Sequence, residues 1–244
     1  MRISETVEQQ LPYLRRYARA VTGAATQGDL AVETMLELLI EGMPDSVTRV
    51  SLFKALDQAL CAPKSWSAAS VPVSPAGRRA LLLTSMEGFN AADAAVILGI
   101  SAAEVEDLLD KSGNDLSAPQ SARIFIIEDE PLIVASLSQI VTSLGHHVAG
   151  IASTRKQAVQ AALDANPDLI LADIQLADGT QGTDAVVEIR SKIKVPAIFI
   201  TAFPERLLTG RDGEPTFLVP KPFKPAQVKT LIGQALFIRS LKIS

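Results

Sequence analysis

The chain contains a single cysteine, Cys61, among its 244 residues, so no disulfide bond can form within it. No apolar run approaches the roughly 20 residues that a membrane-spanning helix needs. The first ten residues, MRISETVEQQ, lack the hydrophobic stretch of a secretion signal. The sequence also shows no internal repeat and no low-complexity tract. Together these absences predict a cytoplasmic protein.

Positive charge is scarce in the first half of the chain. Residues 1–118 contain 10 Lys/Arg and 15 Asp/Glu, a net charge of −5, whereas the remaining residues contain 13 and 12, a net charge of +1. Proteins bind nucleic acids largely through cations that neutralise phosphates. The acidic half therefore argues against a nucleic-acid surface there and favours a basic partner.

The first half is predicted to be helical. Residues 1–61 place apolar side chains at helical spacing in three segments. The stretch 62–75 holds three prolines and four serines without a periodic pattern, which is typical of a linker. Residues 76–117 predict two or three more helices.

Two short helices within this second helical segment form a helix-turn-helix outline, because they meet at Gly99. Asn90 and Ser101 are good N-caps, and Glu104 stands three residues after Ser101, as in a capping box.

From residue 123 onward, strands and helices alternate. The pattern predicts a doubly wound, flavodoxin-like α/β domain over residues 122–244, with a five-stranded parallel sheet. Only the segment around 204–213 looks poorly helical. The expected strands are 124–127, 147–152, 169–173, 197–201 and 216–220, and the expected helices are 133–144, 156–163, 183–193 and 226–237.

Acidic, hydroxyl and basic residues follow four of these strands. They are Glu128 with Asp129, then Asp173, Thr201 and Lys221. Taken singly, each has an ordinary explanation as a helix cap, a strand residue or a surface lysine. In a doubly wound sheet, however, ligands bind at the carboxyl edge of the strands. The shared edge therefore predicts one pocket with three carboxylates, one hydroxyl and one ammonium.

This set of groups suits phosphoryl chemistry. Mg²⁺ prefers oxygen ligands, and it neutralises charge as a phosphoryl group arrives. Asp173 ends an apolar strand and is followed by a loop containing Gly179 and Gly182, so its carboxylate can act as a nucleophile that carries an acyl phosphate. Thr201 and Lys221 can contact the phosphoryl oxygens.

Residues 122–240 resemble the receiver domains of two-component response regulators. The matching motifs are IIEDE (126–130), LILADIQLADGTQG (169–182), FIT (199–201) and PKPF (220–223). The resemblance implies that a sensor histidine kinase phosphorylates Asp173, and that the Lys221–Pro222 peptide bond is cis. It also implies a division of roles: direct Mg²⁺ ligands at Asp129, Asp173 and the main-chain carbonyl of Gln175, a largely water-mediated role for Glu128, and phosphoryl contacts from Thr201 and Lys221.

The chain departs from this family pattern in three places. Glu128 stands where aspartate is commoner. The aromatic switch residue usually stands three positions before the lysine, where this chain has Leu218, so Phe217 is the nearest candidate for that role. The polar segment after Phe203 predicts an atypical fourth helix.

The helical half resembles extracytoplasmic-function sigma factors, with residues 76–117 similar to region 4 and residues 5–61 similar to region 2. The helix that would read DNA contains Glu104, Glu106, Asp107 and Asp110 against one lysine, Lys111. Four acids on that helix would repel DNA. These acids are the candidate partner-binding residues, although they could also be a solvated helix face.

A sigma-like half followed by a receiver resembles the general stress response regulators of alphaproteobacteria. The resemblance implies partner switching. Phosphorylation of Asp173 would release the sigma-like half, which would sequester a NepR-like anti-sigma factor and so free an extracytoplasmic-function sigma factor.

Two other classes of function are possible on the sequence. One is a DNA-binding transcriptional regulator gated by the receiver, which the acidic helix disfavours. The other is a phosphatase of the haloacid dehalogenase type, which needs a second aspartate two residues after the nucleophile, where this chain has Gln175. We therefore expect a phosphoacceptor protein that catalyses only its own phosphorylation and dephosphorylation with Mg²⁺.

Overall fold

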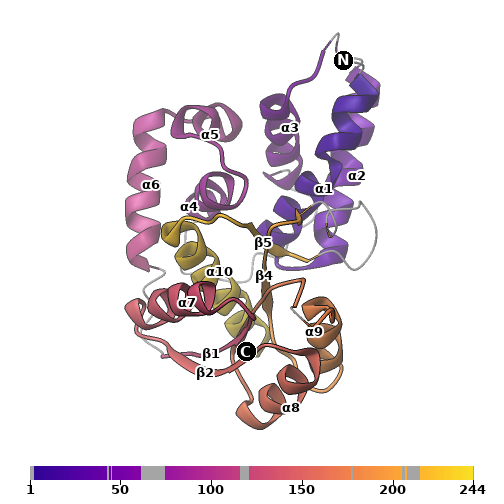
Figure 1. The fold of residues 1–244 in the computed structure, drawn as a ribbon. Helices are drawn as coiled ribbons and strands as arrows, with labels where there is room; N and C mark the ends of the chain where they lie inside the picture. Colours follow the sequence, from indigo (N-terminus) through magenta and orange to yellow (C-terminus); the bar gives the residue numbers. More distant parts are fainter. Residues whose placement is uncertain are drawn as a thin grey trace. The chain divides into compact units, whose positions relative to one another are not determined.

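The computed structural model describes residues 3–42, 44, 46–61, 75–115, 121–176, 178–204, 207 and 215–243. The chain divides into a helical unit within Met1–Asp115 and a sheet-containing unit built from Leu116–Pro204 and Phe217–Ser244. Among the described helices of both units, none is long and apolar enough to cross a membrane. Each unit is described by itself below (Figure 1).

The helical unit contains the helices that the apolar spacing predicts. The first group is α1 (Ile3–Thr22), α2 (Ala25–Gly42) and α3 (Arg49–Cys61). The second group is α4 (Pro75–Leu81), the π-helix η1 (Leu82–Met86), α5 (Ala91–Leu98) and α6 (Ala102–Asp115). The linker predicted at 62–75 lies outside the described residues except for its last residue, Pro75, which begins α4.

The helix-turn-helix outline is confirmed. The Asn90 side chain accepts a hydrogen bond of 2.8 Å from the Asp93 amide, and Gly99 ends α5 with a left-handed φ of 69°. Ser101 and Glu104 form the predicted capping box, with the Ser101 amide donating to Glu104 Oε2 at 2.8 Å and the Glu104 amide donating to Ser101 Oγ at 3.2 Å. These contacts satisfy amide groups that helix starts leave without partners.

A π-helical turn, η1, follows α4 directly and ends the first helical stretch of the second group. The Glu87 amide donates to the Leu82 carbonyl at 3.1 Å, which is an i→i+5 hydrogen bond. Apolar periodicity does not report this change of hydrogen-bond step, so the sequence did not predict it. The turn is followed directly by the buried acid Glu87.

An ion pair and an aromatic cluster join the two helical groups within this unit. Arg16 on α1 donates to both carboxylate oxygens of Glu87, at 3.0 and 2.9 Å, and both side chains are buried. The Phe53 ring on α3 lies 5.5 Å from Tyr17 and 4.9 Å from Phe89, centroid to centroid. The two groups therefore pack as one compact body.

The second unit has the predicted doubly wound sheet, with all strands parallel in the order β2-β1-β3-β4-β5. The chain order reverses at β1, which is where ligand sites occur in such sheets. The strands are β1 (Arg123–Ile127), β2 (His147–Ala152), β3 (Leu169–Ala172), β4 (Ala197–Thr201) and β5 (Phe217–Pro220). Every residue of β3 is buried.

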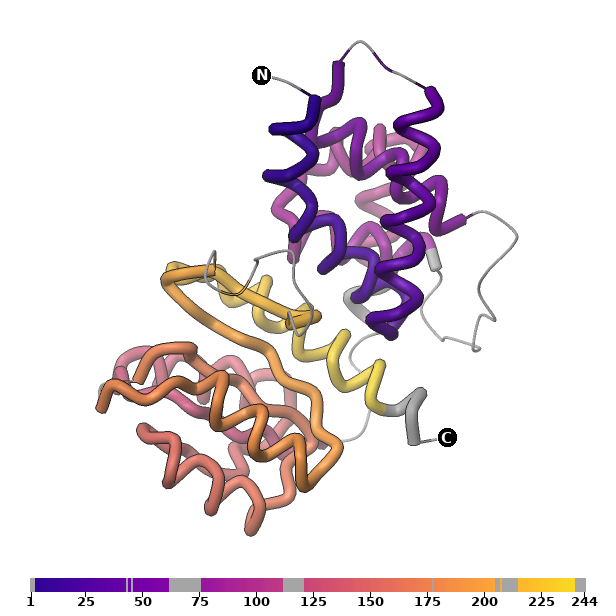
Figure 2. Tube along the Cα trace, turned by 90° about the vertical axis from the view of Figure 1, so that its right-hand side faces the viewer, coloured from indigo at the N-terminus to yellow at the C-terminus, as the bar shows by residue number. Residues whose placement is uncertain are grey.

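Within the described part of this unit, four helices cover the two faces of the sheet. The pairwise contacts place α7 (Pro131–Ser143) with α10 (Pro225–Ile243), and α8 (Arg155–Ala165) with α9 (Gly182–Arg190), as Figures 1 and 2 show from two directions. Between β4 and β5, the expected atypical helix falls mostly outside the described residues, which there are 202–204, 207, 215 and 216.

Candidate functional site

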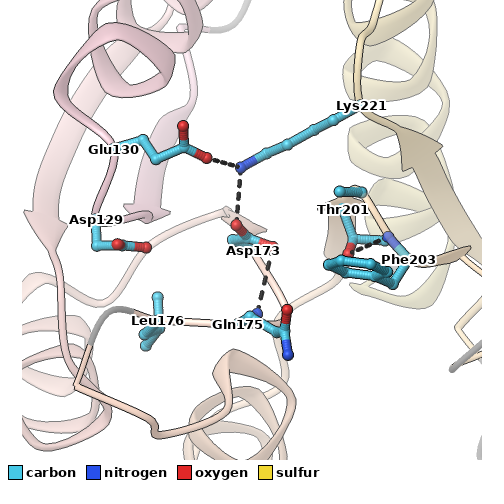
Figure 3. Close-up of a pocket in the computed structure, with 9 residues that line it drawn as sticks. Asp129, Glu130, Asp173, Gln175, Leu176, Thr201, Phe203 and Lys221 are labelled. Carbon is cyan, nitrogen blue, oxygen red and sulfur yellow. Dashed lines mark hydrogen bonds and ion pairs between the residues drawn. The ribbon is translucent and has the colours of Figure 1, made fainter.

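The carboxyl edge of the sheet brings the predicted site residues together. Backbone hydrogen bonds continue past the strand ends, with the Asp173 amide donating to the Ile127 carbonyl at 2.8 Å and the Lys221 amide donating to the Thr201 carbonyl at 2.7 Å. A cavity of about 300 Å³ opens at this edge. Its walls include Asp129, Asp173, Gln175, Thr201 and Lys221 (Figure 3).

Lys221 lies at the centre of the acidic groups. Its Nζ is 2.8 Å from Asp173 Oδ2, 2.9 Å from Glu128 Oε2 and 3.1 Å from Glu130 Oε1. Burial by itself would lower the pKa of Lys221, but its hydrogen bonds and charge interactions with Asp173 and Glu128 raise that pKa above its ordinary value. The lysine is therefore charged throughout the physiological pH range. The predicted cis geometry of the Lys221–Pro222 peptide bond is also confirmed.

Asp173 begins a loop, and the two oxygens of its carboxylate contact different groups. Its Oδ1 accepts hydrogen bonds from the amides of Ile174 at 2.5 Å and Gln175 at 3.4 Å, while Oδ2 faces Lys221. Gly182 is needed beside this loop, since a Cβ there would lie 1.8 Å from the Asp173 carbonyl oxygen. The loop thus fixes the carboxylate that the sequence predicts as the phosphoacceptor.

Glu128 is almost completely buried, with 1% of its surface exposed. Burial raises the pKa of its carboxyl, and the neighbouring Lys221 works against that rise. Its Oε1 accepts a hydrogen bond of 3.2 Å from the Glu130 amide. Its Oε2 has the ion pair with Lys221 but no hydrogen-bond donor among the described residues.

The structure places Thr201 and the two aromatic residues Phe203 and Phe217 in different surroundings. Thr201 is 1% exposed, and its Oγ1 accepts a hydrogen bond of 3.1 Å from the Phe203 amide. Phe203 lines the cavity and is 39% exposed. Phe217, the switch candidate from the sequence, is buried in β5 and is not among the cavity walls.

Glu130 is a site residue that the sequence pattern does not single out. It lines the cavity and pairs with Lys221, although its side chain is 60% exposed. A signal for it exists, because Glu130 is the last letter of the motif IIEDE. Membership of that motif alone, however, assigns the residue no role.

The donor groups fit a hard divalent cation. Carboxylate oxygens of Glu128, Glu130 and Asp173 lie within 4.8 Å of one another, and Asp129 lines the same cavity. Figure 3 shows the Asp129 carboxylate directed toward Asp173. Several carboxylates around a space with room for water are what Mg²⁺ binds in phosphoryl-transfer sites.

The four acids predicted to bind a partner are exposed on α6 but are not equivalent. Glu104 is used by the capping box, which lowers the pKa of its carboxyl, and Asp107 pairs with Lys111 at 2.6 Å. Glu106 and Asp110 are exposed and make no ion pair with a described residue. Two of the four therefore have roles within the helix.

Three family models match successive parts of the chain. Residues 7–57 match the sigma2 domain of PhyR, residues 72–118 match the sigma-like domain of response regulator PhyR, and residues 124–232 match the response regulator receiver domain.

Curated and solved relatives match almost the whole chain. The phyllosphere-induced regulator PhyR of Methylorubrum extorquens is 45% identical over 98% of this chain and 96% of its own length. The crystal structure of the response regulator PhyR from Brucella abortus is 44% identical, covers 100% of this chain and 97% of that chain, and has a TM-score of 0.87. The structure of the anti-anti-sigma factor PhyR from Bartonella quintana is 46% identical, covers 98% and 97%, and also has a TM-score of 0.87.

Proposed function

Because the chain belongs to the PhyR family of response regulators, we propose that phosphorylation of Asp173 controls whether its sigma-like half can bind an anti-sigma factor. In the phosphorylated state that half sequesters a NepR-like anti-sigma factor, and an extracytoplasmic-function sigma factor is released. The phosphodonor is a sensor histidine kinase, and all of these events take place in the cytoplasm. The choice of partner is supported by the Bartonella quintana relative, which is an anti-anti-sigma factor.

The observation that carries the proposal is the arrangement around Asp173. Its carboxylate lies at a cavity wall, is fixed by two loop amides and contacts Lys221 at 2.8 Å. The Lys221 ammonium can exchange its contact with the Asp173 carboxylate for a contact with a phosphoryl oxygen, because it already lies between the acids. Thr201 can donate its hydroxyl to another oxygen once it turns away from the Phe203 amide.

We assign the metal ligands as the sequence predicts, with one addition. Asp129, Asp173 and the Gln175 carbonyl hold Mg²⁺, and Glu128 acts through water, for which its Oε2 offers a buried acceptor without a hydrogen-bond donor among the described residues. Glu130 joins this set because its carboxylate lies within reach of the same oxygens. When bound, the metal neutralises the charge that develops as the phosphoryl group is transferred.

The site is proposed to act on the protein itself and not on a separate substrate.

Phe217 is buried in the core of the sheet, so it can act as the switch residue that the sequence suggests only through contacts within that core. Phe203 is the aromatic residue at the cavity.

Direct DNA binding is disfavoured by the surface of α6. Its exposed acids would face the phosphates if the helix entered a major groove, and each contact with phosphate needs a cation. A gel-shift measurement at low salt with the phosphorylated protein distinguishes the two functions. Salt-sensitive promoter binding would support the DNA-binding alternative.

Labelling with acetyl phosphate and Mg²⁺ tests the phosphoacceptor. We expect stoichiometric labelling of the wild-type chain and none of Asp173→Asn. Asp184→Asn is the matched control, because Asp184 is a 56% exposed acid on α9 outside the cavity, and it should label normally. Retained labelling of Asp173→Asn would place the phosphoryl group on another residue.

A further inference from the structure

The loop that follows Asp173 folds back on itself as a short antiparallel hairpin, formed by residues 174–176 and 178–182. Gln175 and Gln181 are its one bridge pair among the described residues. Two backbone hydrogen bonds flank the bridge, from the Gly182 amide to the Ile174 carbonyl at 2.8 Å and from the Leu176 amide to the Thr180 carbonyl at 3.1 Å. The hairpin therefore connects the phosphoacceptor to the start of α9.

The pairing leaves the backbone groups of Gln175 outside the hairpin. Because the flanking residues make both hydrogen bonds, Gln175 and Gln181 are a non-hydrogen-bonded pair, and their own amides and carbonyls point away from the opposite strand. The Gln175 amide accordingly donates to Asp173 Oδ1 at 3.4 Å (Figure 3), and its carbonyl accepts no hydrogen bond from any residue that the structure describes. This is the carbonyl that the proposed function assigns to Mg²⁺, so the hairpin sets the direction of a metal ligand.

Thr180 ties the hairpin to a neighbouring helix. Its hydroxyl donates to Asp178 Oδ1 at 2.6 Å, and its amide donates to the same oxygen at 3.0 Å. The hydroxyl oxygen also accepts a hydrogen bond of 3.3 Å from the Arg155 amide, at the start of α8. The two hydrogen bonds from Thr180 lower the pKa of the Asp178 carboxyl, so this carboxylate stays an acceptor at neutral pH.

The start of α8 is itself held in place. The Thr154 side chain caps the helix by accepting a hydrogen bond of 3.3 Å from the Gln157 amide. The Arg155 side chain pairs with Glu188 on α9 at 2.9 Å, and the two helices pack against each other. Thr180 thus attaches the hairpin to a fixed part of the domain.

We propose that Thr180 is a positioning residue for Mg²⁺, because its hydroxyl holds the hairpin in the conformation that directs the Gln175 carbonyl to the cavity. Thr180 contacts neither the metal nor the phosphoryl group and acts through the hairpin. A loop that is ordered before the ion arrives need not be ordered by the ion, so the affinity for Mg²⁺ is higher. The inference rests on the proposed function, since this cation site serves the phosphorylation of Asp173.

Mg²⁺ binding to the unphosphorylated full-length chain, measured by titration calorimetry, tests the inference directly. Thr180→Val keeps the shape of the side chain and loses the hydroxyl. We expect the Kd for Mg²⁺ to rise by about tenfold, the lower end of the loss seen when groups that orient metal ligands are removed. Thr180→Ser keeps the hydroxyl and should stay within about twofold of the wild type.

Thr183→Val is the matched control. Thr183 is also half-buried and follows the same hairpin, but its hydroxyl donates to the Gln181 side chain at 3.2 Å and makes no contact with α8. The Kd for Mg²⁺ should therefore change by less than about twofold in this variant.

The rate of labelling by acetyl phosphate separates positioning from a general loss of structure. The rate is measured for each variant over a range of Mg²⁺ concentrations. Thr180→Val should raise the half-saturating Mg²⁺ concentration by about tenfold. The rate at saturating Mg²⁺ should stay within about twofold of the wild type, because the bound ion then fixes the carbonyl itself.

Asp178 offers a second test at an exposed position, where substitution should not affect folding. Asp178→Ala removes the acceptor of both Thr180 hydrogen bonds and should also raise the Kd for Mg²⁺. Its effect should not add to that of Thr180→Val, since both variants break the same contact. Asp178→Asn keeps an acceptor oxygen and should bind Mg²⁺ nearly as the wild type does. A loss equal to that in Asp178→Ala would mean that charge, and not the hairpin, sets the affinity.

The outcomes separate this inference from the function on which it rests. If the wild-type chain binds Mg²⁺ and is labelled, but Thr180→Val has an unchanged Kd for Mg²⁺, Thr180 is not a positioning residue, while the proposed function stands. A lower maximum rate with an unchanged half-saturating concentration would mean that the threonine only supports the fold, which would also overturn the inference. If the wild-type chain binds no Mg²⁺ or is not labelled, the proposed function itself is wrong.

Discussion

At the scale of single residues, Lys221 is the cation that pairs with three carboxylates, those of Glu128, Glu130 and Asp173. Glu128 is the most buried of them, with 1% of its surface exposed. Replacing Lys221 with methionine would leave this buried carboxylate without its counter-ion. Breaking a buried ion pair from one side costs roughly 3 kcal/mol.

The loss of stability in Lys221→Met should depend on pH. Burial already raises the pKa of Glu128, and without the lysine only the hydrogen bond from the Glu130 amide opposes that rise. The folded state then holds a proton that the unfolded state releases, so stability is lost as pH rises through the Glu128 pKa and is regained as pH falls. Urea unfolding at pH 7.5 and pH 5 measures the difference, and an equal loss at both values would contradict this account.

Gly182 supports the phosphoacceptor loop by having no side chain. In Gly182→Ala the new Cβ would overlap the Asp173 carbonyl oxygen, so the loop must shift, at a cost of about 1–3 kcal/mol. We expect slower labelling by acetyl phosphate as well as lower stability. Gly42→Ala is the control, since a Cβ at Gly42 meets no atom within 4 Å. Normal labelling of Gly182→Ala would show that the loop can relax.

At the scale of elements, local patterns predicted most helices and strands but not all their boundaries. Proline explains two of the differences, because α7 begins at Pro131 and α10 at Pro225, earlier than apolar spacing alone suggests. The π-helix η1 was not predicted, because an i→i+5 hydrogen bond leaves no trace in apolar periodicity. Its consequence is the position of Glu87, which no local pattern could connect with Arg16, 71 residues away.

Breaking the Arg16–Glu87 pair from one side should destabilise the helical unit far more than breaking an ion pair on the surface of the same unit. Glu87→Gln leaves the buried Arg16 guanidinium without a carboxylate, and we expect a loss of roughly 3–5 kcal/mol. Lys111→Ala removes an exposed pair with Asp107 and should cost less than about 1 kcal/mol. Chemical denaturation of the two variants compares them directly, and similar losses would mean that the buried pair is open to water.

At the scale of the whole molecule, the sequence predicted the order of the parts and the residues at the carboxyl edge of the sheet. Strand ends in a parallel sheet converge by topology, so Asp173, Thr201 and Lys221 could be assigned to one site before any coordinates. Glu130 could not, because a mostly exposed acid in a loop has many ordinary explanations. The packing of the two helical groups into one body could not be predicted either, since the segment between them carries no periodic pattern.

Residues 1–121 alone should bind the anti-sigma factor without phosphorylation. If only about 1% of the unphosphorylated full-length chain is competent to bind, its affinity should be about 100-fold weaker than that of the fragment. Acetyl phosphate should close this gap for the full-length chain and leave the fragment unchanged. Binding titrations measure both, and a fragment that needs the receiver for binding would show that the receiver does more than restrict access.

The hydrogen bond from the Phe203 amide to Thr201 Oγ1 ties the threonine side chain to the backbone two residues further along the chain. The hydroxyl oxygen constrains the backbone just after β4 for as long as it accepts the hydrogen bond from the Phe203 amide. When the hydroxyl rotates toward an incoming phosphoryl group, the same rotation breaks its hydrogen bond with the Phe203 amide. One bond rotation in a buried side chain would thus exchange a contact with the Thr201 side chain's own loop for a contact with the phosphoryl group on Asp173.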